Sequence, residues 1–286
     1  MQHVIQRLKY FNELVMFQHS IFSLPFIFIA MVVSAEGWFG FWLLFLATLA
    51  AVSARNFAMG LNRYADRAFD GKNPRTANRP SVDGRLDGTS IMLFTLINAV
   101  IFIAIAYMIN DLAFYLSIPV LFVLGSYSYF KRFSAAAHIV LGLSLGFAPM
   151  AGTIAVEGTL HLWTVLLSIG VLFWVAGFDL LYSLQDIDFD KKHGLHSIPS
   201  KYGAQKTMKI SLFFHTLTIV LWALFVWSAE LGTLGWVAVL FSALMLSYEH
   251  YLVRKDFTKI DRAFFTINGY LGIIFLLLII LDAIFT

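Results

Sequence analysis

The segment SIMLFTLINAVIFIAIAYMI, residues 90–109, contains no charged residue. A helix rises about 1.5 Å per residue, so about 20 residues cross the hydrocarbon core of a bilayer, which is roughly 30 Å thick. An uncharged apolar run of this length is typical of a transmembrane helix and is longer than most buried strands or core helices. This segment therefore predicts a chain that crosses a membrane as helices.

Eight further segments have a similar length and apolar character. They are residues 18–35, 39–61, 112–130, 136–156, 162–182, 209–228, 232–251 and 264–285. Of the 286 residues, 59% are hydrophobic and 13% are charged, whereas a soluble domain carries about 25% charged residues. We therefore predict an all-α membrane protein, a bundle of nine transmembrane helices that forms one domain over residues 1–286.

Residues 1–18 differ from these spans because they are amphipathic. Their apolar positions, among them Val4, Leu8, Phe11 and Val15, recur at helical spacing, and Arg7 lies between them. The segment lacks a cleavage site of small residues, so we interpret it as an interfacial helix that leads into the first span, not as a cleaved signal.

The basic residues predict the orientation of the helices. If the N-terminus is cytoplasmic, residues 1–17, 55–89, 131–135, 183–208 and 252–263, with the adjoining helix ends, hold all 20 Lys and Arg residues. The opposite turns hold acidic residues and no Lys or Arg. This segregation follows the positive-inside rule. We expect an integral protein of the bacterial cytoplasmic (inner) membrane whose functional loops face the cytoplasm and whose C-terminus lies outside.

Two acidic motifs fall at this cytoplasmic side. Asn62-Arg-Tyr-Ala-Asp66-Arg-Ala-Phe-Asp70 ends the second span, and Tyr182-Ser-Leu-Gln-Asp186-Ile-Asp-Phe-Asp190 ends the sixth span, 120 positions later. Residues at i and i+4 share a helix face, so we expect Asp66 to neighbour Asp70 and Asp186 to neighbour Asp190, with Asp188 pointing elsewhere. The repeat indicates two pseudo-equivalent halves, with motifs at 62–70 and 182–190 and the ninth span as an addition.

Clustered carboxylates at a membrane boundary favour a bound cation, because like charges repel and burial penalises each of them. The chain has no cysteine, which excludes thiolate chemistry, iron–sulfur clusters and Cys-type zinc sites. Oxygen ligands favour Mg²⁺ or Mn²⁺, and Mg²⁺ is commonly held by a few carboxylates together with substrate phosphates. Two facing motifs would suit two Mg²⁺ ions that bridge a diphosphate.

Basic residues beside the motifs fit such an anion. Those that follow the first motif, close the fourth span or follow the second motif are Arg67, Lys72, Arg75, Arg79, Arg85, Lys131, Arg132, Lys191 and Lys192. Any one of them alone is best explained as a solvated helix end, and we interpret His193 and His196 as loop residues, not ligands. An anionic site at the end of an apolar bundle fits a ligand with a charged head and a greasy tail, such as a polyprenyl diphosphate.

Three segments then carry a family resemblance. ARNFAMGLNRYADRAFDGKNPRTANRP (54–80), YSYFKR (127–132) and YSLQDIDFDKKHGLHSIPSKYG (182–203) resemble the signature segments of the UbiA superfamily of intramembrane aromatic prenyltransferases. The first is most similar to 4-hydroxybenzoate polyprenyltransferases. Ser81 departs from the Leu that often follows this segment, and FTKIDRAFFTINGYLGIIF (257–275) resembles a side branch associated with menaquinone synthesis by the futalosine route.

The resemblance implies an enzyme that transfers a polyprenyl chain to a ring carbon of a hydroxylated aromatic acid in quinone biosynthesis. Its implied metal ligands are Asn62, Asp66, Asp70, Asp186 and Asp190, the four Asp residues being catalytic. Its implied diphosphate-binding residues are Arg67, Lys131, Arg132 and Lys191, and its implied acceptor-binding residues are Arg55 and Tyr182. Arg55 is a functional candidate on position alone, because an arginine inside a transmembrane helix is costly to bury and usually has a functional role.

Two other hypotheses about the function remain open. One keeps the fold and replaces 4-hydroxybenzoate with a dihydroxynaphthoate acceptor. The other is a secondary transporter, since repeated halves and intramembrane Asp residues occur there too. The charged motifs lie at one face instead of the midplane, which disfavours the transporter. Besides its substrates and membrane lipid, we expect no nucleic-acid partner and no obligate protein partner.

Overall fold

The computed structural model describes residues 2–16 and 22–285, and its regular elements in these ranges are all helical. The α-helices are α1 (Gln2–Val15), α2 (Leu24–Ser34), α3 (Phe41–Asp70), α4 (Gly88–Ile109), α5 (Asp111–Phe130), α6 (Ala137–Glu157), α7 (Leu162–Tyr182), α8 (Ile187–Lys192), α9 (Ile198–Ser228), α10 (Thr233–Lys255), α11 (Ile260–Arg262) and α12 (Asn268–Phe285). Two short 3₁₀ turns, η2 (Ser183–Asp186) and η3 (Phe257–Lys259), and one π-helical turn, η4 (Ala263–Ile267), complete the chain.

Eight helical segments in the described ranges are long and apolar enough to cross a membrane, which confirms an integral membrane protein. The first predicted span, residues 18–35, is described only in part. Its described part is α2, an apolar helix of 11 residues, and residues 18–21 lie outside the described residues. Nine full spans and the predicted orientation therefore remain predictions. The predicted N-terminal helix is present as α1.

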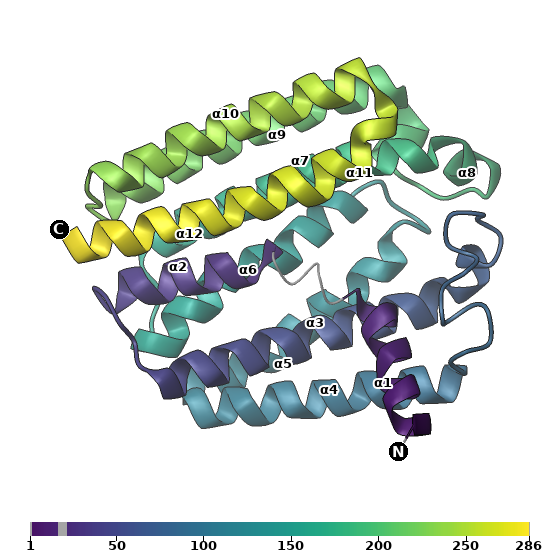
Figure 1. Cartoon of the computed structure of the whole chain (residues 1–286), viewed down its shortest axis with the longest axis horizontal. Coiled ribbons are helices and arrows are strands. Elements are labelled where there is room, and N and C mark those ends of the chain that lie inside the picture. The colour runs from purple at the N-terminus through teal and green to yellow at the C-terminus, as the bar shows by residue number, and fades with distance from the viewer. Residues whose placement is uncertain (1, 17–21, 286) are drawn as a thin grey trace.

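The long helices lie side by side as a bundle (Figure 1). α3, α4 and α5 pack together, α7 packs against both α6 and α9, and α10 lies against α12. The short helix α2 packs against α6 and α12. The long 71–87 connection and α8 lie at one end of the bundle, where α3 and α7 also end (Figure 1).

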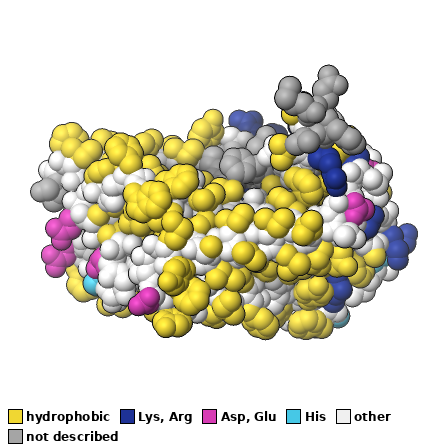
Figure 2. Space-filling model, turned by 90° about the horizontal axis from the view of Figure 1, so that it is seen from below, with side chains coloured by type: hydrophobic (Ala, Val, Ile, Leu, Met, Phe, Trp, Pro, Cys, Tyr) yellow, Lys and Arg dark blue, Asp and Glu magenta, His cyan; other side chains and the backbone are white. Residues whose placement is uncertain are grey.

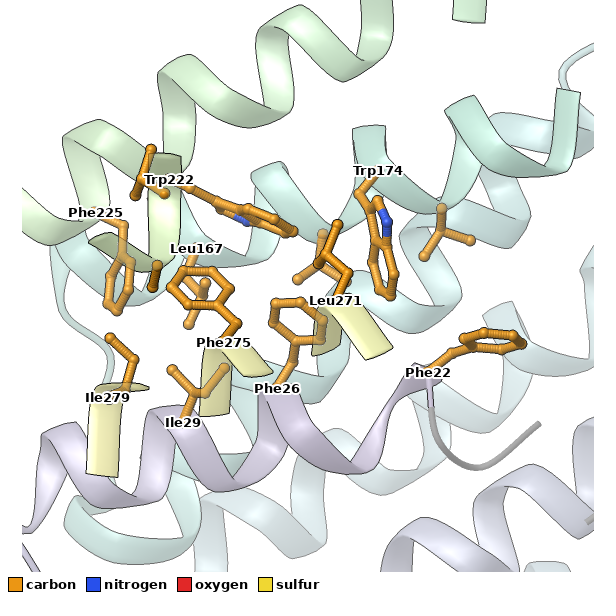
Figure 3. Close-up of a cluster of buried hydrophobic side chains, with 14 of the residues drawn as sticks. Phe22, Phe26, Ile29, Leu167, Trp174, Trp222, Phe225, Leu271, Phe275 and Ile279 are labelled. Atoms are coloured by element: carbon orange, nitrogen blue, oxygen red, sulfur yellow. The ribbon is translucent and has the colours of Figure 1, made fainter. Parts of the chain in front are cut away.

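The largest group of buried hydrophobic side chains is aromatic. Phe26, Trp174, Trp222, Phe225 and Phe275 have 0% exposed surface and pack together across α2, α7, α9 and α12 (Figure 3). Neighbouring rings meet at centroid distances such as 5.0 Å for Phe26 with Trp174 and 5.0 Å for Trp222 with Phe275. Because aromatic pairs at this spacing add to area burial, this cluster holds α2, α7, α9 and α12 together.

Glycines allow the helices to approach closely at several crossings. A Cβ on Gly142 of α6 would collide with the backbone of Leu172 in α7, and one on Gly152 would collide with the backbone of Ile27 in α2. Small residues at such crossings let helix backbones pack without a hydrophobic driving force between them, as is common in membranes.

The two ends of the bundle differ in charge. On the face shown in Figure 2, Lys and Arg gather mainly at the end that carries the long loops, and acidic side chains gather mainly at the other end. At that other end the buried carboxylate of Asp282 accepts hydrogen bonds from the amides of Gly232 (2.6 Å) and Leu234 (2.9 Å), which begin α10. Asp282 therefore caps a helix start that has no acidic residue of its own.

The structure differs from the predicted helix limits around both motifs. α3 continues unbroken for 30 residues to Asp70, so the first motif is helical throughout. α7 ends at Tyr182, and the second motif runs through the 3₁₀ turn η2 into the six-residue helix α8. The expectation that Asp186 and Asp190 lie on one face of a continuous helix is wrong. Only the first motif has that geometry.

Candidate functional site

The first motif occupies the last turns of α3, where helical spacing aligns its polar side chains. Asn62 Nδ2 donates a hydrogen bond of 3.0 Å to Asp66 Oδ2. Asp66 has 2% and Asp70 has 7% of its surface exposed. Two carboxylates buried at the end of a membrane helix need positive charge nearby.

Two basic residues that follow α5 supply this positive charge to Asp66. Lys131 Nζ lies 2.7 Å from Asp66 Oδ2, and Arg132 Nη2 lies 3.7 Å from Asp66 Oδ1. Arg132 also donates to the carbonyl of Ala65 at 2.6 Å. Buried Asp66 Oδ1 accepts no hydrogen bond from the described residues, so this oxygen is available to a further cation.

The second motif is held by the connection between α3 and α4. Arg75 in that connection donates to Asp186 through Nη2 at 2.5 Å and Nε at 3.2 Å, and its Nη1 donates to the Tyr182 hydroxyl at 3.0 Å. Asn73 Nδ2 also donates to Asp186, at 3.2 Å. Burial lowers the pKa of Arg75, but its interactions with Asp186, Tyr182 and Asp261 together outweigh burial and raise the pKa above its ordinary value. Arg75 is therefore a permanent cation.

The same connection joins the two motifs. Arg79 Nη1 lies 2.7 Å from Asp70 Oδ2, while Arg75, four residues earlier, pairs with Asp186. Thus one short segment supplies an arginine to each motif. Sequence reasoning noted both arginines but did not place them in the site. Their position between the motifs, in RTANR (75–79), was the signal that could have identified them.

The other predicted diphosphate ligands lie farther out. Arg67 is exposed and lies beside Gly88 at the start of α4. Lys191 is also exposed and lines a groove of about 610 Å³ together with Asp190, His196 and Lys201. The structure brings Lys131 and Arg132 to the acidic motifs but shows no ion pair from Arg67 or Lys191 to another described residue.

Asp190 and Arg55 are engaged by other partners. Asp190 Oδ2 accepts a 2.7 Å hydrogen bond from the Ser197 hydroxyl at the start of α9. Arg55, inside α3, donates to the carbonyls of Val15 (3.4 Å) and Met16 (3.2 Å) at the end of α1. Its buried Nε has no hydrogen-bond partner among the described residues, so the guanidinium keeps a donor for a ligand.

The oxygen ligands suit a hard cation, though not as a preformed cage. Among the described residues, no group of three or more His, Asp or Glu side chains converges closely enough to hold a metal ion. Each motif instead offers one or two carboxylates, which is the number that Mg²⁺ takes when phosphates complete its shell. The buried Asp66 Oδ1 without a hydrogen-bond partner fits this arrangement.

The chain matches the UbiA prenyltransferase family over residues 23–279. It is 32% identical to a 4-hydroxybenzoate octaprenyltransferase of Tolumonas auensis over 82% of both chains. It is 29% identical to one of Herminiimonas arsenicoxydans over 80% of this chain and 81% of that one.

Solved structures share the fold. A UbiA homologue from Aeropyrum pernix K1, determined in the apo form, superposes with a TM-score of 0.84 at 32% identity, covering 92% of this chain and 98% of that chain. A UbiA homologue from Archaeoglobus fulgidus, bound to DMAPP and Mg²⁺, superposes with a TM-score of 0.74 at 18% identity, covering 94% and 98%. At this lower identity the likeness shows the fold alone.

Proposed function

This chain belongs to the UbiA prenyltransferase family and is a prenyltransferase, and from that premise we propose that it joins a polyprenyl chain to a ring carbon of a hydroxylated aromatic acid of the 4-hydroxybenzoate type. The observation that carries the proposal is the pairing of both acidic motifs with arginines of one connection, Arg79 with Asp70 and Arg75 with Asp186. Membership in an enzyme family also sets the transporter reading aside.

We propose that the donor's diphosphate lies between the two motifs. Mg²⁺, taken as two ions held by Asn62, Asp66, Asp70, Asp186 and Asp190, would neutralise phosphate charge and favour its departure. In this structure, Arg75, Arg79 and Lys131 pair with carboxylates of the two motifs. When those carboxylates bind metal, each of the three cations can bind a phosphate oxygen instead. Arg132, Arg67 and Lys191 would add positive charge around this position.

The chemistry follows from charge placement. As the carbon–oxygen bond to diphosphate breaks, negative charge grows on the leaving group, and fixed guanidinium and ammonium groups stabilise it. The electron-rich ring carbon ortho to a phenolic hydroxyl then bonds to the allylic carbon. The proton displaced from that ring carbon passes to a carboxylate of the motifs or to the departing diphosphate. The apolar prenyl tail lies among the helices, open to lipid.

We propose Arg55 for the acceptor's carboxylate, because its Nε is buried without a partner and it lies about two turns deeper along α3 than Asn62. Tyr182 would border the acceptor from the second motif. Residues 1–286 would form one prenyltransferase domain of two pseudo-equivalent halves in a bacterial inner membrane, with the motif-bearing end cytoplasmic. The segregated Lys and Arg residues support that orientation.

The test is a direct assay. Purified protein in lipid nanodiscs receives Mg²⁺, a polyprenyl diphosphate and either 4-hydroxybenzoate or a dihydroxynaphthoate, and products are identified by mass spectrometry. We expect prenylated hydroxybenzoate. Product from the naphthoate alone would assign the acceptor to the alternative, and no product from either acid with folded protein would refute the proposed reaction.

A further inference from the structure

A buried polar cluster in the C-terminal half lies outside the acidic motifs. Glu249 of α10 and Asn268, the first residue of α12, are each 0% exposed. Asn268 Nδ2 donates to Glu249 Oε1 at 2.7 Å, and Trp174 Nε1 of α7 donates to Asn268 Oδ1 at 2.8 Å. Trp174 belongs to the aromatic cluster of Figure 3. Burying an ionisable group among membrane helices is unfavourable, so the buried carboxyl group of Glu249 indicates a functional role.

Asn268 closes the π-helical turn η4. Its Nδ2 also lies 3.3 Å from the carbonyl of Ala263, the first residue of that turn. A π turn inserts one residue into the helical ladder and leaves a carbonyl without its ordinary amide partner, and such turns are frequent at functional sites. The Asn268 side-chain amide adds a donor to the first carbonyl of this turn, and Glu249 and Trp174 hold that amide from two other helices.

The turn lies directly beneath the second motif. Phe264 in η4 contacts the Tyr182 ring at a centroid distance of 4.3 Å. Three residues before Phe264, Asp261 accepts a 3.2 Å hydrogen bond from Gln185, which precedes Asp186. We call residues 257–268 the floor segment, because they support Tyr182 and Gln185 from one side while Arg75 holds Tyr182 and Asp186 from the other.

Apolar packing makes the support rigid. Ile260, Ala263 and Ile267 of the floor segment form one buried cluster with Leu181 and Leu184, which flank Tyr182 in the chain. A shift of the π turn is therefore transmitted to the backbone of the second motif, since packed interiors respond to displacement as a unit.

We propose that Glu249 and Asn268 are positioning residues for the second acidic motif: they lock the π turn whose Phe264 holds Tyr182, and through it Arg75 and Asp186, in the diphosphate-binding arrangement. The inference rests on the proposed function of that motif. It adds two residues, one of them an intramembrane carboxyl, that touch neither substrate nor metal.

The test compares Glu249→Leu with Glu249→Gln. The glutamine keeps an oxygen that accepts from Asn268, whereas the leucine removes the shorter of the two hydrogen bonds that the Asn268 amide nitrogen donates and leaves only the one to the Ala263 carbonyl. Thr153→Val is the matched control, because it breaks a buried 3.1 Å hydrogen bond between Thr153 and Thr164, residues of α6 and α7 outside this cluster. The readouts are the Kd for a prenyl thiodiphosphate with Mg²⁺, by calorimetry, and the separate kcat and KM for the donor.

We expect Glu249→Leu to raise both the Kd and the KM about tenfold, because donor binding must then restore the arrangement of the second motif that the wild type holds before binding, with a smaller change in kcat. Glu249→Gln and Thr153→Val should bind like the wild type. Equal binding by wild type and Glu249→Leu, or equal weakening by Glu249→Leu and Thr153→Val, would overturn the inference. If Glu249→Leu does not fold, Phe264→Leu, which keeps the polar cluster, should show the same rise, and wild-type binding would overturn it.

A double-mutant cycle separates positioning from general stability. Tyr182→Phe removes the hydroxyl that accepts from Arg75, so its effect on the Kd should be non-additive with that of Glu249→Leu, and strict additivity would contradict the inference. Asp186→Ala separates a failure of the proposed function from a failure of the positioning role alone. Retained donor binding in Asp186→Ala would refute the proposed function, whereas lost binding there with an unaffected Glu249→Leu would refute only the positioning role.

Discussion

Replacing Arg75 with glutamine should weaken binding of the prenyl diphosphate donor. Arg75 makes two hydrogen bonds to Asp186, at 2.5 and 3.2 Å, and one to Tyr182 at 3.0 Å. Its side chain is 34% exposed, so solvent screens it in part. A charged hydrogen bond is worth about 1.5–3 kcal/mol. Loss of one such bond to phosphate lowers kcat/KM about 10- to 100-fold.

Arg85→Gln is the matched control for Arg75→Gln. Arg85 lies in the same connection but pairs with Glu13 of α1 at 2.6 Å, away from both motifs. The assay measures initial rates of prenylation over a range of donor concentrations at saturating acceptor and Mg²⁺. Arg85→Gln should stay within about twofold of wild type, since exposed ion pairs contribute little. Equal kinetics for the two variants would refute the assignment of Arg75 to the diphosphate.

Three further predictions concern packing, capping and metal. Asp282→Ala removes the acceptor for the amides of Gly232 and Leu234, so unfolding in mixed micelles should require about 1–2 kcal/mol less free energy; an unchanged denaturation midpoint would contradict the cap. Gly177→Ala places a methyl group against the His215 ring and should lower stability by about 1–3 kcal/mol in the same experiment, whereas wild-type stability would contradict the close packing of α7 on α9. Chelation with EDTA should abolish prenylation, and Mg²⁺ or Mn²⁺ should restore it; turnover that persists in EDTA would contradict the metal requirement.

Hydropathy predicted the helical membrane fold because each apolar run is long and uninterrupted. Of the first predicted span, the described helix is α2, which has 11 residues, and residues 18–21 lie outside the described part of the chain. Hydropathy ended α3 nine residues early, at residue 61, because charged residues in the last turns lower hydropathy. These residues are nevertheless helical, since their backbone hydrogen bonds continue and their charges pair with neighbouring loops. Hydropathy predicts where the apolar part of a helix ends, and α3 continues beyond that point.

The two motifs look equivalent in sequence but differ in structure. The first remains on one helix, and the second bends through a 3₁₀ turn after Tyr182. Spacing alone could not reveal this break, because the floor segment that supports it, residues 257–268, is about 70 positions away in the sequence. Local pattern identifies candidate ligands, whereas tertiary packing decides how they are aimed.

The positions of the basic residues relative to the carboxylates were the least apparent from the sequence. Arg67 adjoins Asp66 in sequence, yet successive helix residues point about 100° apart, and Arg67 lies beside Gly88. Arg75 and Arg79 are more distant in sequence but reach the carboxylates because the connection folds back over the end of the bundle. The path of a long loop produces no periodic pattern of residues, so it cannot be predicted from a single sequence.

The central claim is that both motifs form one diphosphate site, and equilibrium binding tests it most directly. Calorimetry with a prenyl thiodiphosphate and Mg²⁺ would compare wild type, Asp66→Asn, Asp186→Asn and the double variant, each shown to be folded. A single site predicts that either substitution abolishes measurable binding and that the double variant is no worse. Wild-type affinity in either single variant would contradict the claim, because one motif would then bind the donor without the other.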